Sequence, residues 1–471
     1  MTKFTLKGLI LSLLAVLTLS LLLVACGGDA PTATSVKNTP LPATTAPATT
    51  GGVPVSPTTA AVGVTPLPTV TGLAQTVAPA TTAAPQPTTA PATTVAVTTA
   101  VPTTAPATNT DPFVAYIEAG SLNVITASGA GKKTLLQANN QQVVNGRPDW
   151  SPDNKNLVVP VHLNKGPNQL FIAEVGGSTR QLIPGQPGGT SDDEPEWSPD
   201  GKTIIFTRTL DSNKNGVYEN TEPHEIWAVD QDGQNSRKLA AGRQPSWAPD
   251  SQRIAFVTNG VVKADMPAPQ DNALHLINAR GQNEWEPINT AKIPEDLSNL
   301  GYPFGPATIL LQYPTWLDGG KTIGFTTAGH SGLMITLNSS SGKDLKIWDT
   351  QYEGGFGSTD SLGKGTYITY QAFPASGYTT IRLLSITGTP NLEKFSGINI
   401  GGPQQKVMAL YPALTENSGL TLAYFKISGS EGTGVDLKSL SGSLVVARVN
   451  NGAVQEKELL KGNIQGIVWS K

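Results

Sequence analysis

The sequence predicts an all-β fold, and more closely a β-propeller. Nearly the same phrase recurs five times along the chain, and each copy is followed by a short run rich in β-branched and aromatic residues. Apolar and polar positions alternate in these runs, and a helical period is almost absent. A repeat of this length cannot bury its apolar face alone, so each copy must stack against its neighbours.

The recurring phrase joins a Pro-x-Trp triplet to a tight turn. The copies are Arg147–Asp153, Glu194–Lys202, Gln244–Asp250, Tyr313–Lys321 and a degenerate Tyr411–Leu414. In Ser-Pro-Asp-Gly, proline presets φ, aspartate can bond its own backbone, and glycine takes a positive φ. We therefore expect Asp153, Asp200 and Asp250 to shape turns on one rim rather than to form a ring of catalytic or metal-binding carboxylates. The tryptophans are expected to pack between units.

Each unit is predicted to contain four strands, of which the first carries the Pro-x-Trp triplet. The second strands are Asn156–His162, Thr203–Arg208, Arg253–Thr258, Thr322–Thr327 and Leu420–Phe425. The third strands are exemplified by Asn168–Val175, His224–Asp230, Ala273–Ala279 and Thr380–Ile386. The fourth strands are short, as in Thr179–Ile183 and Arg237–Ala241. Gly and Asp-Gly turns separate the last two strands, as hairpins require.

The spacing of the units predicts seven blades. The first-strand landmarks fall at Trp150, Trp197, Trp247, Trp316, near Asp360, at Leu414 and at Trp469, between 44 and 69 residues apart. Phe113–Gly120 reads as a second strand without a first, and Ile464–Ser470 as a first strand without a second. Together they are predicted to close one composite blade, which leaves no open sheet edge between them. The unit near Asp360 has the weakest pattern, so six or eight blades stay open as alternatives.

The phrase Pro-x-Trp-Ser-Pro-Asp-Gly-Lys, complete at Pro195–Lys202, resembles the WD40-like repeat of TolB-type β-propellers. The resemblance covers Phe113–Lys471 and implies a TolB-like propeller fold. It says less about activity, because function lives in sites placed on a fold. Similar propellers include sugar lyases that use histidines and carboxylates in the central funnel.

The first residues predict export. Met1–Ala25 has two lysines near its start and an apolar run over Leu9–Val24. The segment Leu23–Gly27 resembles the lipobox of bacterial lipoproteins, which implies a signal peptide over 1–25 and lipidation of Cys26. An uncleaved membrane anchor is the alternative. Either way the remainder is expected outside the cytoplasm, on a membrane-anchored protein at the cell surface or the periplasmic face.

Residues 26–110 are predicted to be the lipidated Cys26 followed by a disordered stalk. From Asp29 to Thr110 the chain is mostly Thr, Ala, Pro and Val, and it has no aromatic residue. Such a composition provides nothing to pack and favours extended conformations. The propeller is then assigned to residues 111–471. The net charge is −3 without a basic cluster, so nucleic acid is not an expected partner, and a monomer is expected.

A calcium loop is predicted between two strands of one unit. Residues 211–222 satisfy the pattern Asp-x-Asn-x-Asn-Gly-x5-Glu, and Ca²⁺ prefers six to eight oxygen ligands. The predicted ligands are the side chains of Asp211, Asn213, Asn215, Glu219 and Glu222, with the carbonyl of Val217. The flanking segments are strands, so the loop would be grafted on a hairpin and would bind weakly, in the range of about 10⁻⁴–10⁻³ M. The alternative is a polar hairpin rich in turn-forming residues.

No catalytic residue is assigned. The chain lacks a Gly-x-Ser-x-Gly elbow, and Gly329–Gly332 is only a distant approach to one. Its four histidines, His162, His224, His275 and His330, show no metal-binding spacing. The expected function is a surface-anchored binding module of the bacterial cell envelope that holds a protein, peptide or glycan on a propeller face. The alternatives are a secreted polysaccharide lyase or hydrolase with its active site in the funnel, and a simple scaffold.

Two long departures from the repeat are candidate binding loops, Asp265–Asp271 and Leu297–Tyr313. The second is rich in Pro and Gly and contains three aromatic residues, Tyr302, Phe304 and Tyr313, a composition common in binding loops. The alternative is a loop that packs on the propeller face.

Overall fold

The fold comes from a computed structural model. It describes residues 111–164, 166–186, 188–219, 221–258, 272–290, 309–329, 331–352, 355–361, 363–374, 378–392, 394–415, 419–428 and 441–471. The predicted signal peptide, Cys26 and the predicted stalk lie outside this part of the chain. Within it, no helix is long and apolar enough to cross a membrane.

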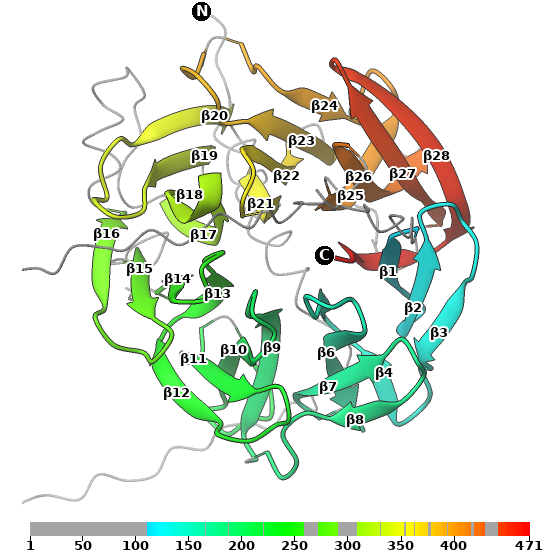
Figure 1. The fold of residues 1–471 in the computed structure, drawn as a ribbon, viewed down its shortest axis with the longest axis vertical. Helices are drawn as coiled ribbons and strands as arrows, with labels where there is room; N and C mark the ends of the chain where they lie inside the picture. The colour runs from blue at the N-terminus through cyan, green and yellow to red at the C-terminus, as the bar shows by residue number, and fades with distance from the viewer. Residues whose placement is uncertain are drawn as a thin grey trace, which may run out of the picture. The chain divides into compact units, whose positions relative to one another are not determined.

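Seven antiparallel sheets are arranged around a ring and form a β-propeller (Figure 1). Blade 1 contains β29 (Ile464–Trp469), β1 (Phe113–Glu118), β2 (Ser121–Thr126) and β3 (Lys133–Leu136). Blade 2 contains β4 (Gln142–Val144) and β5 (Asp149–Trp150), which share the innermost position, then β6 (Asn156–Leu163), β7 (Asn168–Glu174) and β8 (Thr179–Gln181). Blade 3 contains β9 (Thr190–Trp197), β10 (Thr203–Leu210), β11 (His224–Asp230) and β12 (Arg237–Ala241).

The other four blades repeat this order from the centre outwards. Blade 4 contains β13 (Arg243–Trp247), β14 (Arg253–Val257), β15 (Ala273–Asn278) and β16 (Trp285–Asn289). Blade 5 contains β17 (Ile309–Leu317), β18 (Thr322–Gly329), β19 (Ser331–Asn338) and β20 (Lys346–Tyr352). Blade 6 contains β21 (Gly355–Ser361), β22 (Tyr367–Phe373), β23 (Thr380–Ser385) and β24 (Ile398–Ile400). Blade 7 contains β25 (Val407–Thr415), β26 (Thr421–Ser428), β27 (Gly442–Asn450) and β28 (Ala453–Gly462).

The predicted blade count and the composite blade are both confirmed. The ring has seven blades rather than six or eight, and the weak unit near Asp360 is blade 6. Strand β29 pairs antiparallel with β1, with Val114 opposite Trp469 and Ala115 opposite Val468. This pairing joins segments more than 300 residues apart in the sequence and closes the ring.

Apolar side chains from consecutive blades share one cluster at each of several blade interfaces. Between blades 4 and 5, Leu274 and Phe325 pack in the same cluster as Trp316, which is 1% exposed. The indole N–H of Trp316 donates to the carbonyl of Ser246 in the preceding blade at 3.0 Å. The repeat tryptophan therefore packs between blades, as predicted.

The repeat turn also has its predicted form. In blade 3 the hydroxyl of Ser198 and the backbone N–H of Lys202 both donate to Asp200 Oδ1, at 2.7 and 3.1 Å. Gly201 has φ +73°. The carboxylate thus satisfies its own turn, which leaves it no part in a ring of ligands.

The connections give the two faces of the ring different characters. One face, here called the turn face, carries the Ser-Pro-Asp-Gly turns and the links from third to fourth strands, which are short except for 386–397. The other, the loop face, receives the links from second to third strands and from blade to blade. The long links 211–223, 258–272, 290–308 and 429–441 all leave from it. Variation in length is therefore concentrated on one face.

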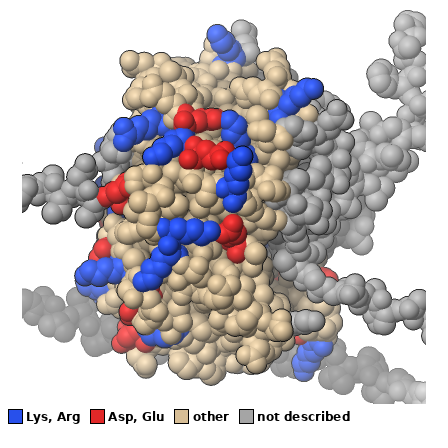
Figure 2. All heavy atoms as spheres, turned by 90° about the vertical axis from the view of Figure 1, so that its right-hand side faces the viewer, with Lys and Arg blue, Asp and Glu red and all other residues tan. Residues whose placement is uncertain are grey.

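The outermost strand of blade 7 carries alternating charges along its exposed edge. Strand β28 includes Glu456, Lys457 and Glu458, and most of its residues are exposed. Figure 2 shows basic and acidic side chains interleaved on this side of the propeller. Charged residues on an edge strand disfavour pairing with another chain.

Candidate functional site

The middle residue of the Pro-x-Trp triplet connects blades along the central channel. The carboxylate of Asp149 in blade 2 accepts the backbone N–H of Trp197 in blade 3 at 2.8 Å. The carboxylate of Glu196 in blade 3 accepts the backbone N–H of Trp247 in blade 4 at 3.1 Å. A single repeat position thus holds successive inner strands together.

Two basic side chains pair with carboxylates at this level of the channel. Lys471 Nζ donates to Asp149 Oδ2 at 2.8 Å. Arg147 Nη2 of blade 2 lies 3.2 Å from Asp360 Oδ1 of blade 6, and Asp360 also accepts the backbone N–H of Leu414 at 2.7 Å. Blades 2 and 6 are not neighbours in the ring, so the ion pair spans the channel.

We call Arg147, Asp149, Glu196, Asp360 and Lys471 the channel cluster. Burial raises the pKa of Glu196 to about 8, and the negative charge of Asp149 adds to this effect. Burial also raises the pKa of Asp360, against the opposing effect of Arg147. Each carboxylate of the cluster accepts a backbone N–H from the following blade. The carboxylates of the cluster therefore connect each inner strand to the next blade.

A second hydrogen-bonded row lines the channel two positions earlier in the repeat, at the residue that precedes Pro. Glu194 Oε2 accepts Thr207 Oγ1 at 2.7 Å and the backbone N–H of Gln244 at 3.0 Å. Gln244 Oε1 accepts the backbone N–H of Tyr313 at 2.9 Å, and Thr359 Oγ1 donates to the Tyr313 carbonyl at 3.0 Å. Glu194, Gln244 and Tyr313 have positive φ at bulges in their strands, which turns these residues out of the regular pleat.

The structure places Tyr313 in the first strand of a blade, as its Pro-x-Trp phrase predicts, rather than in a loop. Strand β17 begins at Ile309, so the last part of the segment Leu297–Tyr313 is an inner strand and Tyr313 belongs to the channel wall. Tyr302 and Phe304 lie outside the described residues, and their binding role stays a prediction. The candidate loop Asp265–Asp271 also lies outside.

The described histidines lie in three separate blades. His162 is near the end of β6, His224 begins β11, and His275 lies within β15. His275 Nδ1 is 2.7 Å from Glu284 Oε1, a residue of the link to the outermost strand β16. His330 lies outside the described residues.

The predicted calcium loop links β10 to β11 on the loop face and is organised by its own side chains. Asp211 Oδ1 and Oδ2 accept the backbone N–H groups of Asn215 and Gly216, both at 3.0 Å. Asn213 Oδ1 accepts the same N–H of Asn215 at 2.9 Å, and Asn215 Oδ1 accepts that of Val217 at 2.7 Å. The side-chain oxygens of Asp211 and Asn213 thus share one donor and lie close together.

Glu222, the last residue of the loop, is tied back to the loop's start. It is 3% exposed and accepts Nδ2 of Asn213 at 2.6 Å and the backbone N–H of Ser212 at 3.1 Å. Across the described residues, no group of three or more His, Cys, Asp and Glu side chains is arranged to hold a metal ion. The predicted ligands Asp211, Asn213 and Glu222 are gathered in one hydrogen-bonded cluster, whereas Glu219 instead faces Thr221 Oγ1 at 3.3 Å.

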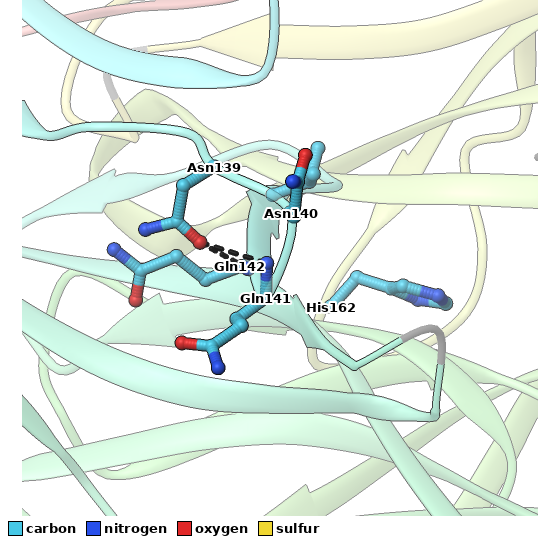
Figure 3. Close-up of a pocket in the computed structure, with 6 residues that line it drawn as sticks. Asn139, Asn140, Gln141, Gln142 and His162 are labelled. Carbon is cyan, nitrogen blue, oxygen red and sulfur yellow. Dashed lines mark hydrogen bonds between the residues drawn. The ribbon is translucent and has the colours of Figure 1, made fainter.

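A cavity on the loop face was missed by the sequence analysis. It has a volume of about 420 Å³ and is lined by Asn139, Asn140, Gln141, Gln142, Val143 and His162. The four carboxamides come from the link between β3 and β4 and from the first residue of β4, and Figure 3 shows their side chains fanning out around this turn. The run Asn-Asn-Gln-Gln is the signal that could have revealed it, since four consecutive Asn or Gln residues occur nowhere else in the sequence.

The comparisons with known proteins concern the fold. No protein-family model matches the chain, and no curated protein matches its sequence. Among solved structures it is similar to TolB from Acinetobacter baumannii, with a TM-score of 0.41 and 14% identity over 76% of this chain and 66% of that one. It is also similar to an oligogalacturonate lyase in complex with manganese, with a TM-score of 0.49 and 10% identity over 70% and 83% of the two chains. A third similar structure is a puromycin hydrolase, with a TM-score of 0.47 and 12% identity over 74% of this chain and 52% of that one.

The seven four-stranded sheets of the ring define the class, a seven-bladed β-propeller, which is the fold that the resemblance to TolB-type repeats implied. The chain spans about two thirds of the TolB chain and about half of the hydrolase. Binding proteins and enzymes share this architecture, so the function has to be argued from the residues of this chain.

Proposed function

We propose that this protein is a non-enzymatic binding module of the bacterial cell envelope, anchored through a lipid on Cys26, which holds a protein, peptide or glycan on the loop face of its propeller. The observation that carries the proposal is the difference between the two faces. The turns of the turn face satisfy their own polar groups, as Asp200 does. Four long links leave from the loop face, where loops can vary without disturbing the blades.

Exposed apolar side chains support the same face. Only three large hydrophobic residues are exposed among the described residues, and two of them, Val143 at 40% and Val217 at 50%, lie on the loop face. Single exposed apolar residues are ordinary. Val217, however, lies within the long 211–223 link, which supports contact with a partner on the loop face rather than on the turn face.

The competing proposal is a lyase or hydrolase in the funnel. A carboxyl with a pKa of about 8, as at Glu196, is the kind of group that acids in active sites use. Against this, the carboxylates of the channel cluster are engaged by backbone N–H groups and basic side chains, and the described histidines lie apart. We therefore favour a structural role for the channel and a binding role for the loop face.

We also propose that residues 211–222 bind Ca²⁺ weakly. Asp211, Asn213 and Glu222 supply the oxygen ligands that a hard cation prefers, and they are already gathered by hydrogen bonds. An ion would fix the hairpin beside the loop-face mouth of the channel and so order the binding surface. Millimolar calcium should raise the melting temperature of the wild type, and a Glu222→Gln variant should lose that response.

The test of the binding function is a cross-linked pull-down from native envelopes with the full chain as bait, in the presence and absence of a calcium chelator. Reproducible capture of one protein or glycan supports the binding module, and sensitivity to the chelator connects it to the 211–222 loop. Turnover of an envelope polysaccharide without stable capture would instead support the funnel enzyme.

A further inference from the structure

We infer that the cavity lined by residues 139–143 and His162 is a binding site for a neutral oligosaccharide. This inference rests on the proposed binding function and names its ligand class. The site lies on the loop face, where the link from β3 enters β4 and where β6 ends. It has a volume of about 420 Å³ and is a shallow, open site, since four of its six lining residues are exposed.

The hydrogen-bonding groups of the cavity are divided between those that shape it and those that remain available. Asn139 Oδ1 accepts the backbone N–H groups of Gln141 and Gln142 at 2.8 and 3.0 Å (Figure 3). Gln142 Nε2 donates to the carbonyl of Gln137 at 3.0 Å. These bonds fix the turn, so the cavity is formed before a ligand arrives.

The side chains of Asn140 and Gln141 are exposed, and within the described part of the chain neither makes a hydrogen bond. A carboxamide offers two donors and an oxygen acceptor side by side. Two such groups on one turn can each engage neighbouring hydroxyl groups, which also donate and accept. This is the chemistry of a sugar ring with several adjacent hydroxyls.

The lining of the cavity carries no charged side chain, which disfavours an ionic ligand. No Asp, Glu, Lys or Arg is among the six lining residues. An acidic sugar or a phosphate would need paired basic groups to offset its desolvation. The lining therefore favours a neutral oligosaccharide over a charged one.

The apolar part of the cavity also fits a sugar better than a peptide. Val143 is 40% exposed, and it lies opposite His162 in the pairing of β4 with β6. Val143 thus offers one small apolar patch for the C–H face of a pyranose. A peptide would need deeper pockets for its anchoring side chains, and the cavity offers a single valine.

The experiment measures binding of soluble neutral oligosaccharides to the purified full chain by isothermal titration calorimetry. The neutral probes are cello-, malto- and chito-oligosaccharides. An oligogalacturonate tests for binding of a charged sugar, and an unbiased peptide pool tests for binding of a peptide. We expect saturable binding of at least one neutral probe. The double substitution Asn140→Ala and Gln141→Ala should weaken that binding about thirtyfold, since the two lost hydrogen bonds contribute roughly 1 kcal/mol each.

A matched control removes two exposed amides from the turn face. Gln231 and Gln234 are exposed in the link between β11 and β12, and their double alanine variant should bind the sugar as the wild type does. Both double variants replace exposed turn residues, so unchanged melting temperatures will show that neither effect comes from unfolding.

Three results would overturn the inference: no neutral probe binds, the charged or peptide arm binds instead, or the Asn140→Ala and Gln141→Ala variant binds as tightly as the wild type. The pull-down separates this failure from failure of the proposed function. If a partner is still captured from envelopes and the double variant captures it equally well, the binding module stands and this ligand class is wrong. If nothing is captured and no sugar binds, both are wrong.

Discussion

Glu196 should make the stability of the propeller depend on pH. Burial raises its pKa to about 8 from an ordinary value of 4.5. Between these values the folded protein holds a proton that the unfolded chain has lost. The free energy of unfolding therefore falls as the pH rises from about 5 to about 8, and the contribution of this group is most favourable below that window.

The size of the effect follows from the shift. One pKa unit corresponds to about 1.4 kcal/mol, so the whole gap between 4.5 and about 8 sets an upper bound on the order of 5 kcal/mol. Glu196 is only partly buried, so screening by solvent reduces the realised effect. We therefore expect about 2 kcal/mol to be realised.

Replacement of Glu196 by glutamine isolates this contribution. The amide oxygen of Glu196→Gln can still accept the backbone N–H of Trp247, now at 3.1 Å from Glu196 Oε1, but the side chain cannot ionise. The variant should match the wild type near pH 5 and exceed it by about 2 kcal/mol near pH 9. Thermal and urea unfolding of the full chain over this range would measure both values.

Glu225→Gln provides a control of opposite sign. Burial alone would raise the pKa of Glu225, but hydrogen bonds from Lys238 and Trp227 outweigh it and lower this pKa. The ionised form of Glu225 therefore stabilises the fold at pH values above the pKa of the unfolded chain. This variant should be less stable than the wild type at neutral pH, and the difference should vanish in acid. Parallel pH profiles for Glu196→Gln and the wild type would refute the reasoning, as would a variant less stable at every pH.

Three further outcomes are expected. Asp192→Asn should cost about 3–5 kcal/mol, because it leaves Arg208 buried without the carboxylate that it contacts at 2.7 Å; chemical unfolding checks this, and a loss under 1 kcal/mol contradicts it. Trp316→Ala should cost about 3–5 kcal/mol through the cavity left between blades 4 and 5, and an unchanged unfolding midpoint would disprove the packing role. Glu222→Gln should abolish the calcium-dependent rise in melting temperature. Without calcium it should lower the free energy of unfolding by no more than about 1 kcal/mol, and a persistent calcium response would show that this loop is not the site.

The fold could be predicted because its determinants are local and repeated. Each Pro-x-Trp triplet and the turn after it mark an inner strand and the start of the second strand. One mistaken unit therefore does not disturb the assignment of the others. Closure by β29 and β1 was also predictable, since each segment lacked the strand that the other supplied. The blade near Asp360 was recognisable only by its strands, because its triplet lacks both Pro and Trp.

The sites could be predicted less well because they depend on contacts between distant segments. The sequence shows Arg147 and Asp360 but not that blades 2 and 6 face each other across a channel. It shows Tyr313 after a Pro- and Gly-rich stretch but not that β17 begins at Ile309. The 211–222 loop was visible because its candidate ligands are all local, and the amide cavity was overlooked because Asn and Gln runs are read as loop residues.

The channel cluster explains why the middle residue of the triplet varies from blade to blade. Where that residue is Asp149 or Glu196, its side chain reaches the backbone of the next blade. Where it is Thr315, a short hydroxyl contact of 2.7 Å to Ser361 makes the connection between blades 5 and 6. At the closing seam the corresponding residue is Val468, which cannot form such a bond, and Lys471 instead contacts Asp149.

The carboxylates of the repeat are thus distributed according to the need to hold one blade to the next. Asp149, Glu196 and Asp360 lie close enough in the channel for their charges to interact, and each of them also accepts a backbone N–H from the following blade. In our proposal, recognition of a partner belongs to the loop face, with its long links and its amide-lined cavity.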